Sequence, residues 1–227
     1  MIRLAIFDFD GTLVDTITDV ALCFNRALTT CGYPAHPTSL YPRFVGGNLE
    51  TVISRMLPPD RCSTADIERV VQVYRPLYLN DAKPNTCPYP GMLSLLTDMA
   101  AQGIRLGVST NKAQQLTEAL CDTLFPPDTF AGIIGYDNAH PSKPDPYSVH
   151  VLLEQCGVSA AEAVYIGDGR TDLETAANAG VPCIFVTWGQ GYDVNPQETG
   201  IALAADTPAD ILAWLRQQNG GSLCNPL

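Results

Sequence analysis

Short apolar runs alternate along most of the chain with longer segments in which apolar residues recur at helical spacing. A short, uninterrupted apolar run fits a strand that is buried on both faces, as in a parallel sheet. The predicted strands are residues 4–7, 104–108, 130–135, 163–166, 183–186 and, more weakly, 201–204. The predicted helices are residues 92–102, 113–124, 147–156, 173–179 and 209–218. This alternation predicts an α/β fold with a doubly wound, mostly parallel sheet.

Residues 16–87 interrupt this alternation, because they show helical spacing without a convincing buried strand. Helical patterns occur at residues 18–32, 43–57 and 63–74, and Thr18 with Asp19 is predicted to cap the first of them. We therefore expect a Rossmann-like α/β core with a small inserted helical cap. The expected boundaries are 1–15 and 88–219 for the core, 16–87 for the cap and 220–227 for a loose tail.

The charge balance limits the kinds of partner. The 227-residue chain has 24 acidic and 13 basic side chains, which give a net charge of −11 at pH 7. This charge argues against binding to nucleic acid or to an anionic membrane. It also opposes general steering of an anionic substrate, so any phosphate site must be locally cationic. No apolar run is long enough to span a membrane.

The cysteines and the N-terminus suggest a location. Eight cysteines are present, with no C-x-x-C pair and no Cys/His cluster at zinc spacing. Reduced thiols that serve as small hydrophobic residues fit this pattern. The N-terminus runs directly into the first strand, which leaves no room for a signal peptide. We expect a cytoplasmic protein.

Two acids directly follow the first predicted strand. Asp8 and Asp10 end the apolar run and precede Gly11, which allows a sharp turn. Ligands of an open α/β sheet bind at the carboxyl ends of its strands. Acids that follow a buried run are costly if they lack a partner, and a divalent cation would compensate them. The pattern therefore favours a binding site over an ordinary turn.

Three further strand ends also carry polar groups. Ser109, Thr110 and Asn111 offer hydroxyls and a backbone amide at a predicted helix start, where phosphate binds well. Lys143 lies in the stiff sequence KPDP, and Asp168 and Asp172 follow the predicted strand 163–166. Each feature alone has an ordinary structural explanation, as a cap, a surface lysine or a first-turn acid. Their recurrence at successive strand ends indicates one shared site.

The ordered set of DFDGT, the hydroxyl at Thr110, the lysine at Lys143 and GDGRTD resembles the signature set of the haloacid dehalogenase-like phosphatases, from about residue 4 to residue 215. The resemblance implies that Asp8 attacks phosphorus and forms an aspartyl-phosphate. Asp10 would protonate the leaving oxygen and then activate water. Thr110, Lys143 and the amide of Asn111 would hold the phosphoryl oxygens.

The same resemblance implies Mg²⁺ as the cofactor. The ion would be bound by the Asp8 carboxylate, the Asp10 backbone carbonyl and Asp168. Asp172 would support these ligands without binding the ion directly. The physical chemistry agrees, because several carboxylates beside a phosphate would repel it without a cation. Mg²⁺ prefers oxygen ligands of this kind, and Lys143 adds a positive charge.

The segment 16–87 is similar to the small cap of one branch of this family, and within that branch the chain looks closest to the phosphoglycolate phosphatases. The shared sequences are DGTLVDT, FVGGNLETVISRML, STNK and KPDP, although the order of glycine and asparagine near Gly46 and Gly47 differs from the usual pattern. The resemblance implies a small phosphorylated metabolite as the partner, with 2-phosphoglycolate as the favoured substrate. Such a cap can close over the substrate and exclude water.

A cap that selects phosphoglycolate needs a cation or amide donors for the substrate carboxylate. Arg43 is the nearest basic residue in the resembling segment, and Gly46 and Gly47 would let backbone N–H groups approach closely. In the alternative interpretation, Arg43 is a solvated surface residue and the glycines only form a loop. Both interpretations stay open at this point.

Other functions are compatible with the same fold. A phosphosugar mutase would use the same core, and hydrolysis of inorganic pyrophosphate also stays open. A dehalogenase is disfavoured because its chemistry has no need of Asp10. A non-catalytic binding protein is disfavoured because Asp8, Asp10, Lys143 and Asp168 are all present. The sequence leaves the oligomeric state open.

Overall fold

The computed structural model describes residues 1–191 and 194–220. Its main sheet has six strands in the order β5-β4-β1-β6-β7-β8, and each neighbouring pair is parallel. The strands are β1 (Leu4–Phe7), β4 (Arg105–Ala113), β5 (Gly132–Tyr136), β6 (Ala163–Gly167), β7 (Cys183–Val186) and β8 (Ile201–Ala205). The strand order reverses at β1, which is where a doubly wound sheet forms its binding crevice. The predicted fold class is confirmed.

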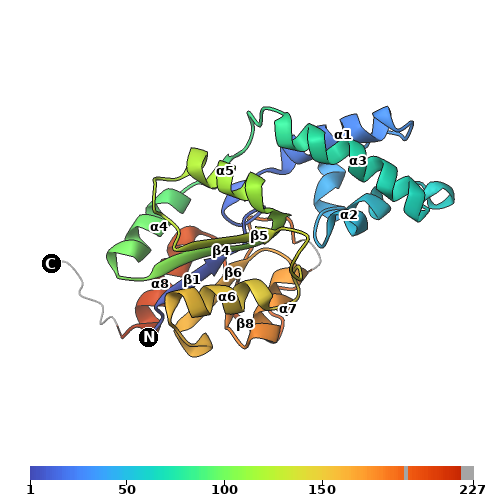
Figure 1. Ribbon diagram of the computed structural model, residues 1–227. Helices are drawn as coiled ribbons and strands as arrows, with labels where there is room; N and C mark the ends of the chain where they lie inside the picture. The colour runs from blue at the N-terminus through green and yellow to red at the C-terminus, as the bar shows by residue number, and fades with distance from the viewer. Residues whose placement is uncertain (192–193, 221–227) are drawn as a thin grey trace.

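Helices cover both faces of this sheet (Figure 1). One face packs against α4 (Met92–Ala101), α5 (Gln114–Leu124) and α8 (Pro208–Gln218), and the other against α6 (Tyr147–Cys156) and α7 (Arg170–Ala179). Successive residues of β1 alternate between the two hydrophobic clusters, with Ala5 and Phe7 in one and Leu4 and Ile6 in the other. This two-sided burial is why the first strand is a continuous apolar run.

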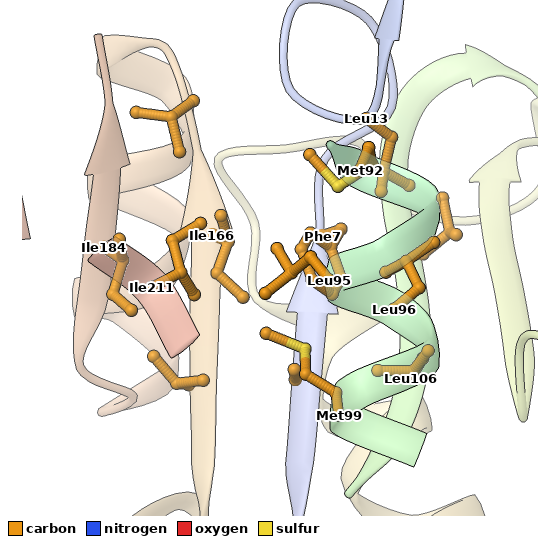
Figure 2. Packing of buried hydrophobic residues seen from close by; sticks show 14 of the residues in the cluster. Phe7, Leu13, Met92, Leu95, Leu96, Met99, Leu106, Ile166, Ile184 and Ile211 are labelled. Atoms are coloured by element: carbon orange, nitrogen blue, oxygen red, sulfur yellow. The ribbon is translucent and has the colours of Figure 1, made fainter. Parts of the chain in front are cut away.

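The cluster on the α4 side fixes the central strand. Figure 2 shows Leu95 and Met99 of α4 packed beside Phe7, and Ile211 of α8 close to Ile166 of β6. These five side chains are at most 3% exposed. Packing against α4 and pairing with β4 and β6 therefore fix β1, which Asp8 directly follows.

The segment between the first two strands of the sheet forms a separate helical body. It contains α1 (Ile17–Thr30), α2 (Leu49–Met56) and α3 (Thr64–Asn80), with short 3₁₀ turns at Thr38–Arg43 and Pro59–Arg61. A further 3₁₀ turn, Ala160–Glu162, lies in the core and precedes β6. The helices bury their own cluster, in which the rings of Phe24 and Tyr74 stack at 3.8 Å. Figure 1 shows them grouped at one end of the molecule. The cap boundaries stay a prediction, which this packing supports.

A two-stranded antiparallel ribbon links the sheet to the helical body, and the sequence pattern did not predict it. Its strands, β2 (Val14–Asp15) and β3 (Cys87–Pro88), lie where the chain leaves and re-enters the core. The predicted cap at Thr18 and Asp19 is wrong, because α1 begins at Ile17 after its N-cap, Thr16. Asp19 instead accepts three hydrogen bonds from residues 85 and 86.

The expectation that Ser109, Thr110 and Asn111 start a helix is also wrong. β4 continues through them to Ala113, with an irregular register after Ser109, and α5 begins at Gln114. The extended backbone is retained because Ala113 still pairs with Tyr136 of β5. The other sheet strands and core helices lie close to their predicted positions.

Three expectations concern features outside this architecture. Except for Gly220, the predicted loose tail lies outside the described residues. Seven of the eight cysteines are described, and all seven are free thiols. Within the described part of the chain, none of the helices is long and apolar enough to span a membrane.

Candidate active site

The carboxyl end of β1 places Asp8 against a buried lysine. Lys143 Nζ lies 2.8 Å from Asp8 Oδ1, and both side chains are almost completely buried. Gly11 follows with φ of +83°, and a Cβ there would collide with the carboxylate of Asp168. The turn after β1 therefore requires glycine for both its conformation and its close approach to Asp168.

Three residues fix the position of Lys143 in the site. Its ammonium donates to Asp172 Oδ1 at 2.6 Å and to the hydroxyl of Tyr165 at 3.1 Å. The side chain of Asn111 grips the Lys143 backbone, accepting from its N–H at 2.8 Å and donating to its carbonyl at 3.0 Å. The end of β4 thus fixes the loop that follows β5, which sets where the positive charge lies.

Three buried carboxylates cluster at the site, and two of them, Asp8 and Asp172, contact this lysine. Oxygens of Asp8, Asp168 and Asp172 lie within 4.8 Å of one another. Burial, together with repulsion from Asp172, raises the pKa of Asp8 to about 7 and that of Asp168 to about 8. A cluster of oxygen ligands whose charges repel each other suits a hard divalent cation.

The hydrogen bonds of these acids distinguish their roles. Asp168 accepts from the Thr12 hydroxyl at 3.0 Å and from the Gln190 N–H at 2.6 Å. Both oxygens of Asp172 are already used, one by Lys143 and the other by the N–H groups of residues 168 and 169. Asp172 also accepts from the Tyr165 hydroxyl, so it has four hydrogen bonds, one of them from the Lys143 ammonium, whereas Asp168 has two from neutral donors. This difference agrees with Asp172 acting as a support.

Asp10 contacts a different lysine from the one that Asp8 and Asp172 contact. Its Oδ1 accepts a hydrogen bond from the Thr16 hydroxyl at 2.7 Å and another from Lys112 Nζ at 2.8 Å. Lys112 also donates to the hydroxyl of Tyr78 in α3 at 2.9 Å. Sequence reasoning gave no role to Thr16, Lys112 or Tyr78. The available signal was Lys112 itself, a lysine in the run STNK directly after a buried strand pattern.

A cavity of about 1250 Å³ lies between the sheet and the helical body. Its lining brings together most of the predicted site residues, namely Asp8, Asp10, Arg43, Gly46, Gly47, Asn111, Lys143, Asp168 and Asp172. Thr110 is the exception: it is buried and not part of the lining, and its hydroxyl accepts from the Lys112 N–H at 3.3 Å. Seven acids and six bases line this cavity.

A family model described as haloacid dehalogenase-like hydrolase matches residues 5–186. The chain belongs to this family. A phosphoglycolate phosphatase of Rhodospirillum rubrum is 33% identical over 226 residues, covering 95% of this chain and 91% of the relative. A phosphoglycolate phosphatase of Yersinia pestis is 31% identical, covering 93% and 89%. These matches identify this haloacid dehalogenase-like hydrolase as an enzyme of the phosphatase class.

Solved structures show the same architecture. A crystal structure from Lactobacillus delbrueckii subsp. bulgaricus, provisionally assigned as a phosphoglycolate phosphatase, superposes with a TM-score of 0.85 at 26% identity, covering 92% of this chain and 96% of that one. A haloacid dehalogenase-like hydrolase structure from Bacteroides fragilis gives 0.83 at 28% identity, covering 93% and 100%. The similarity therefore includes the helical segment as well as the sheet.

In this hydrolase, the raised pKa values of Asp8 and Asp168 predict a pH-dependent stability when metal is removed. The folded protein retains protons that the unfolded chain has released, so the free energy of unfolding falls as pH rises from about 4 to about 8. Asp168→Asn should reduce this fall, because it removes one of the two carboxyls whose pKa is raised. Urea unfolding in EDTA at pH 5.5 and pH 8 tests this. An identical pH dependence in both proteins would contradict the electrostatic account of the cluster.

Proposed function

We propose that this chain is a magnesium-dependent phosphomonoester hydrolase that works through an aspartyl-phosphate, with 2-phosphoglycolate as its substrate. The observation that carries the proposal is the Asp8 carboxylate 2.8 Å from the Lys143 ammonium, on the wall of a large cavity. The lysine can neutralise phosphoryl oxygens beside the nucleophile. Relatives named phosphoglycolate phosphatase support the choice of substrate.

The reaction has two steps in this proposal. A carboxylate oxygen of Asp8 attacks phosphorus, and the bond from phosphorus to the leaving oxygen breaks while Asp10 donates a proton to that oxygen. Asp10, now ionised, then takes a proton from a water molecule that attacks the phosphorus of the aspartyl-phosphate, and the bond from phosphorus to the Asp8 oxygen breaks. Inorganic phosphate leaves, and both acids return to their starting states.

The remaining residues hold the phosphoryl group and the ion. Lys143, the backbone N–H of Asn111 and the hydroxyl of Thr110 would bind phosphoryl oxygens. Asp8, the Asp10 carbonyl and Asp168 would hold Mg²⁺, with Asp172 as their support. When bound, Mg²⁺ would supply positive charge beside the phosphoryl group.

The loop of the helical body offers a site for the substrate carboxylate. Arg43 lines the cavity and forms no ion pair with any described residue. Gly46 and Gly47 have φ of +99° and +91°, so the glycines do form a sharp turn. Arg55 fixes this turn by donating to the carbonyls of residues 44, 45 and 46. The carbonyls are thereby engaged, and the N–H side of the turn is left for an anion.

Arg43→Ala is therefore expected to lower kcat/KM for 2-phosphoglycolate by roughly 10- to 100-fold, as for a lost charge-assisted hydrogen bond. Hydrolysis of p-nitrophenyl phosphate, which lacks the carboxylate, should be nearly unchanged. Arg216→Ala is the matched control, because it removes the same charge from an exposed position outside the cavity lining. Equal losses on both substrates would assign Arg43 to folding or to cap closure.

A substrate panel separates the proposal from its alternatives. The hydrolase should release phosphate from 2-phosphoglycolate faster than from inorganic pyrophosphate. A phosphosugar mutase would instead require a sugar bisphosphate and return the phosphoryl group to a sugar. The cytoplasmic location stays a prediction.

A further inference from the structure

A chain of hydrogen bonds links the helical body to Asp10. Tyr78 is in the last turn of α3, Lys112 is at the end of β4, and Asp10 follows β1. The ammonium of Lys112 lies 2.9 Å from the Tyr78 hydroxyl and 2.8 Å from Asp10 Oδ1. Lys112 is 34 positions from Tyr78 and 102 positions from Asp10 along the chain, so only the folded arrangement brings the three residues together.

Lys112 is charged although it is buried. Only 4% of its side chain is exposed, and its ammonium also faces the rings of Tyr78 and Phe9, with centroids at 4.8 and 5.7 Å. Burial alone would lower the pKa of Lys112, but Asp10 and the Tyr78 hydroxyl raise it above its ordinary value. A buried charge is costly without partners, so these two groups account for its presence.

The two hydrogen bonds to Asp10 reach the same oxygen. Thr16 and Lys112 both donate to Oδ1, whereas Oδ2 accepts no hydrogen bond from the described residues. The side chain is 31% exposed and lines the cavity. One oxygen is therefore anchored twice, and the other is left to exchange a proton with whatever occupies the cavity.

We propose that Lys112 is a positioning residue that holds Asp10 in orientation for proton transfer, and that Tyr78 makes this orientation depend on the seating of α3 against the core. The proposal rests on the proposed function, in which Asp10 is the proton donor and acceptor. It adds a physical link between the helical body and the chemistry. Loss of the contact between α3 and Lys112 would leave Asp10 held by Thr16 alone.

The test uses the leaving group. Glycolate, an alkoxide leaving group, needs a proton from Asp10, whereas p-nitrophenolate leaves without one. Lys112→Met keeps the side-chain length and removes the charge. In the first turnover, measured by rapid quench with Mg²⁺, it should slow glycolate release by roughly 10- to 100-fold, as expected for a misplaced catalytic group. Release of p-nitrophenolate should change less than about threefold, well below the loss of an acid–base group.

Tyr78→Phe removes one hydroxyl and should slow glycolate release by roughly 3- to 10-fold, again without a matching effect on p-nitrophenolate. Tyr74→Phe is the matched control, because Tyr74 lies one turn earlier in α3, its ring stacks on Tyr78 at 5.3 Å, and its hydroxyl makes no hydrogen bond with the described residues. It should behave as wild type. If Lys112→Met does not fold, Tyr78→Phe carries the same test.

Further variants separate failure of this inference from failure of the proposed function. Lys112→Arg should recover part of the lost rate, and Lys112→Met should add no further loss in an Asp10→Ala protein. If Asp10→Ala itself releases glycolate at the wild-type rate, the proposed function fails. If Asp10→Ala is slow but Lys112→Met and Tyr78→Phe match wild type, or slow both leaving groups equally, the positioning role is overturned.

Discussion

Asp8→Asn is expected to abolish turnover and to leave the protein folded. The amide cannot form the acyl-phosphate, so at least three orders of magnitude in kcat should be lost, which corresponds to ~4 kcal/mol of barrier. Steady-state hydrolysis of p-nitrophenyl phosphate with saturating Mg²⁺ measures this. Activity within tenfold of wild type would exclude Asp8 as the nucleophile.

The stability of the same variant provides its control. Asp8 is one of three clustered buried acids, two of which contact Lys143, and burial with repulsion from Asp172 raises its pKa. Removing its charge should therefore leave the metal-free Tm unchanged or higher at pH 8. Asp172 remains as the partner of Lys143. A large fall in Tm would mean that the loss of activity reflects unfolding and says nothing about the nucleophile.

Removal of Mg²⁺ is expected to have the second large effect. EDTA should abolish activity and added Mg²⁺ should restore it, because the clustered carboxylates of Asp8, Asp168 and Asp172 suit a divalent cation that neutralises phosphoryl charge. Binding also has a readout that is independent of activity. At 100 times its Kd, Mg²⁺ should stabilise the folded protein by about 2.7 kcal/mol and raise Tm by roughly 5–10 °C.

Asp168→Ala should raise the Mg²⁺ concentration needed for half-maximal activity and remove most of this thermal shift. Asp206→Ala, an exposed acid in the turn before α8, is the control and should leave both unchanged. Full activity in EDTA would contradict the metal requirement. An unchanged Mg²⁺ requirement in Asp168→Ala would remove Asp168 from the metal site.

The parts of the fold that were predictable from sequence depend on local patterns. β1 is buried on both faces, so its apolar run and the acids at its end were visible directly. The ribbon β2–β3 has two residues per strand, too few for any periodicity. The end of β4 is polar like a helix start, and only its pairing with β5 keeps Ala113 in a strand.

The site residues also divide into those that local sequence patterns predict and those that depend on distant contacts. Asp8, Asp10, Lys143 and Asp168 were predictable because they follow strands whose ends must meet at one edge of the sheet. The contacts of Asn111 with Lys143 and of Tyr78 with Lys112 join segments 32 and 34 residues apart. Such pairs depend on how loops and the helical body fold back, which a single sequence does not reveal.

Direct detection of the phosphorylated residue tests the central claim. In Asp10→Asn the water that ends the reaction lacks its base, so the intermediate should accumulate with p-nitrophenyl phosphate, whose leaving group needs no proton. After an acid quench, mass spectrometry of the digested protein is expected to find one phosphoryl group on the peptide that contains Asp8, matched by a burst of one p-nitrophenolate per chain. A phosphoryl group on another residue, or turnover without a phosphorylated chain, would contradict the proposed mechanism.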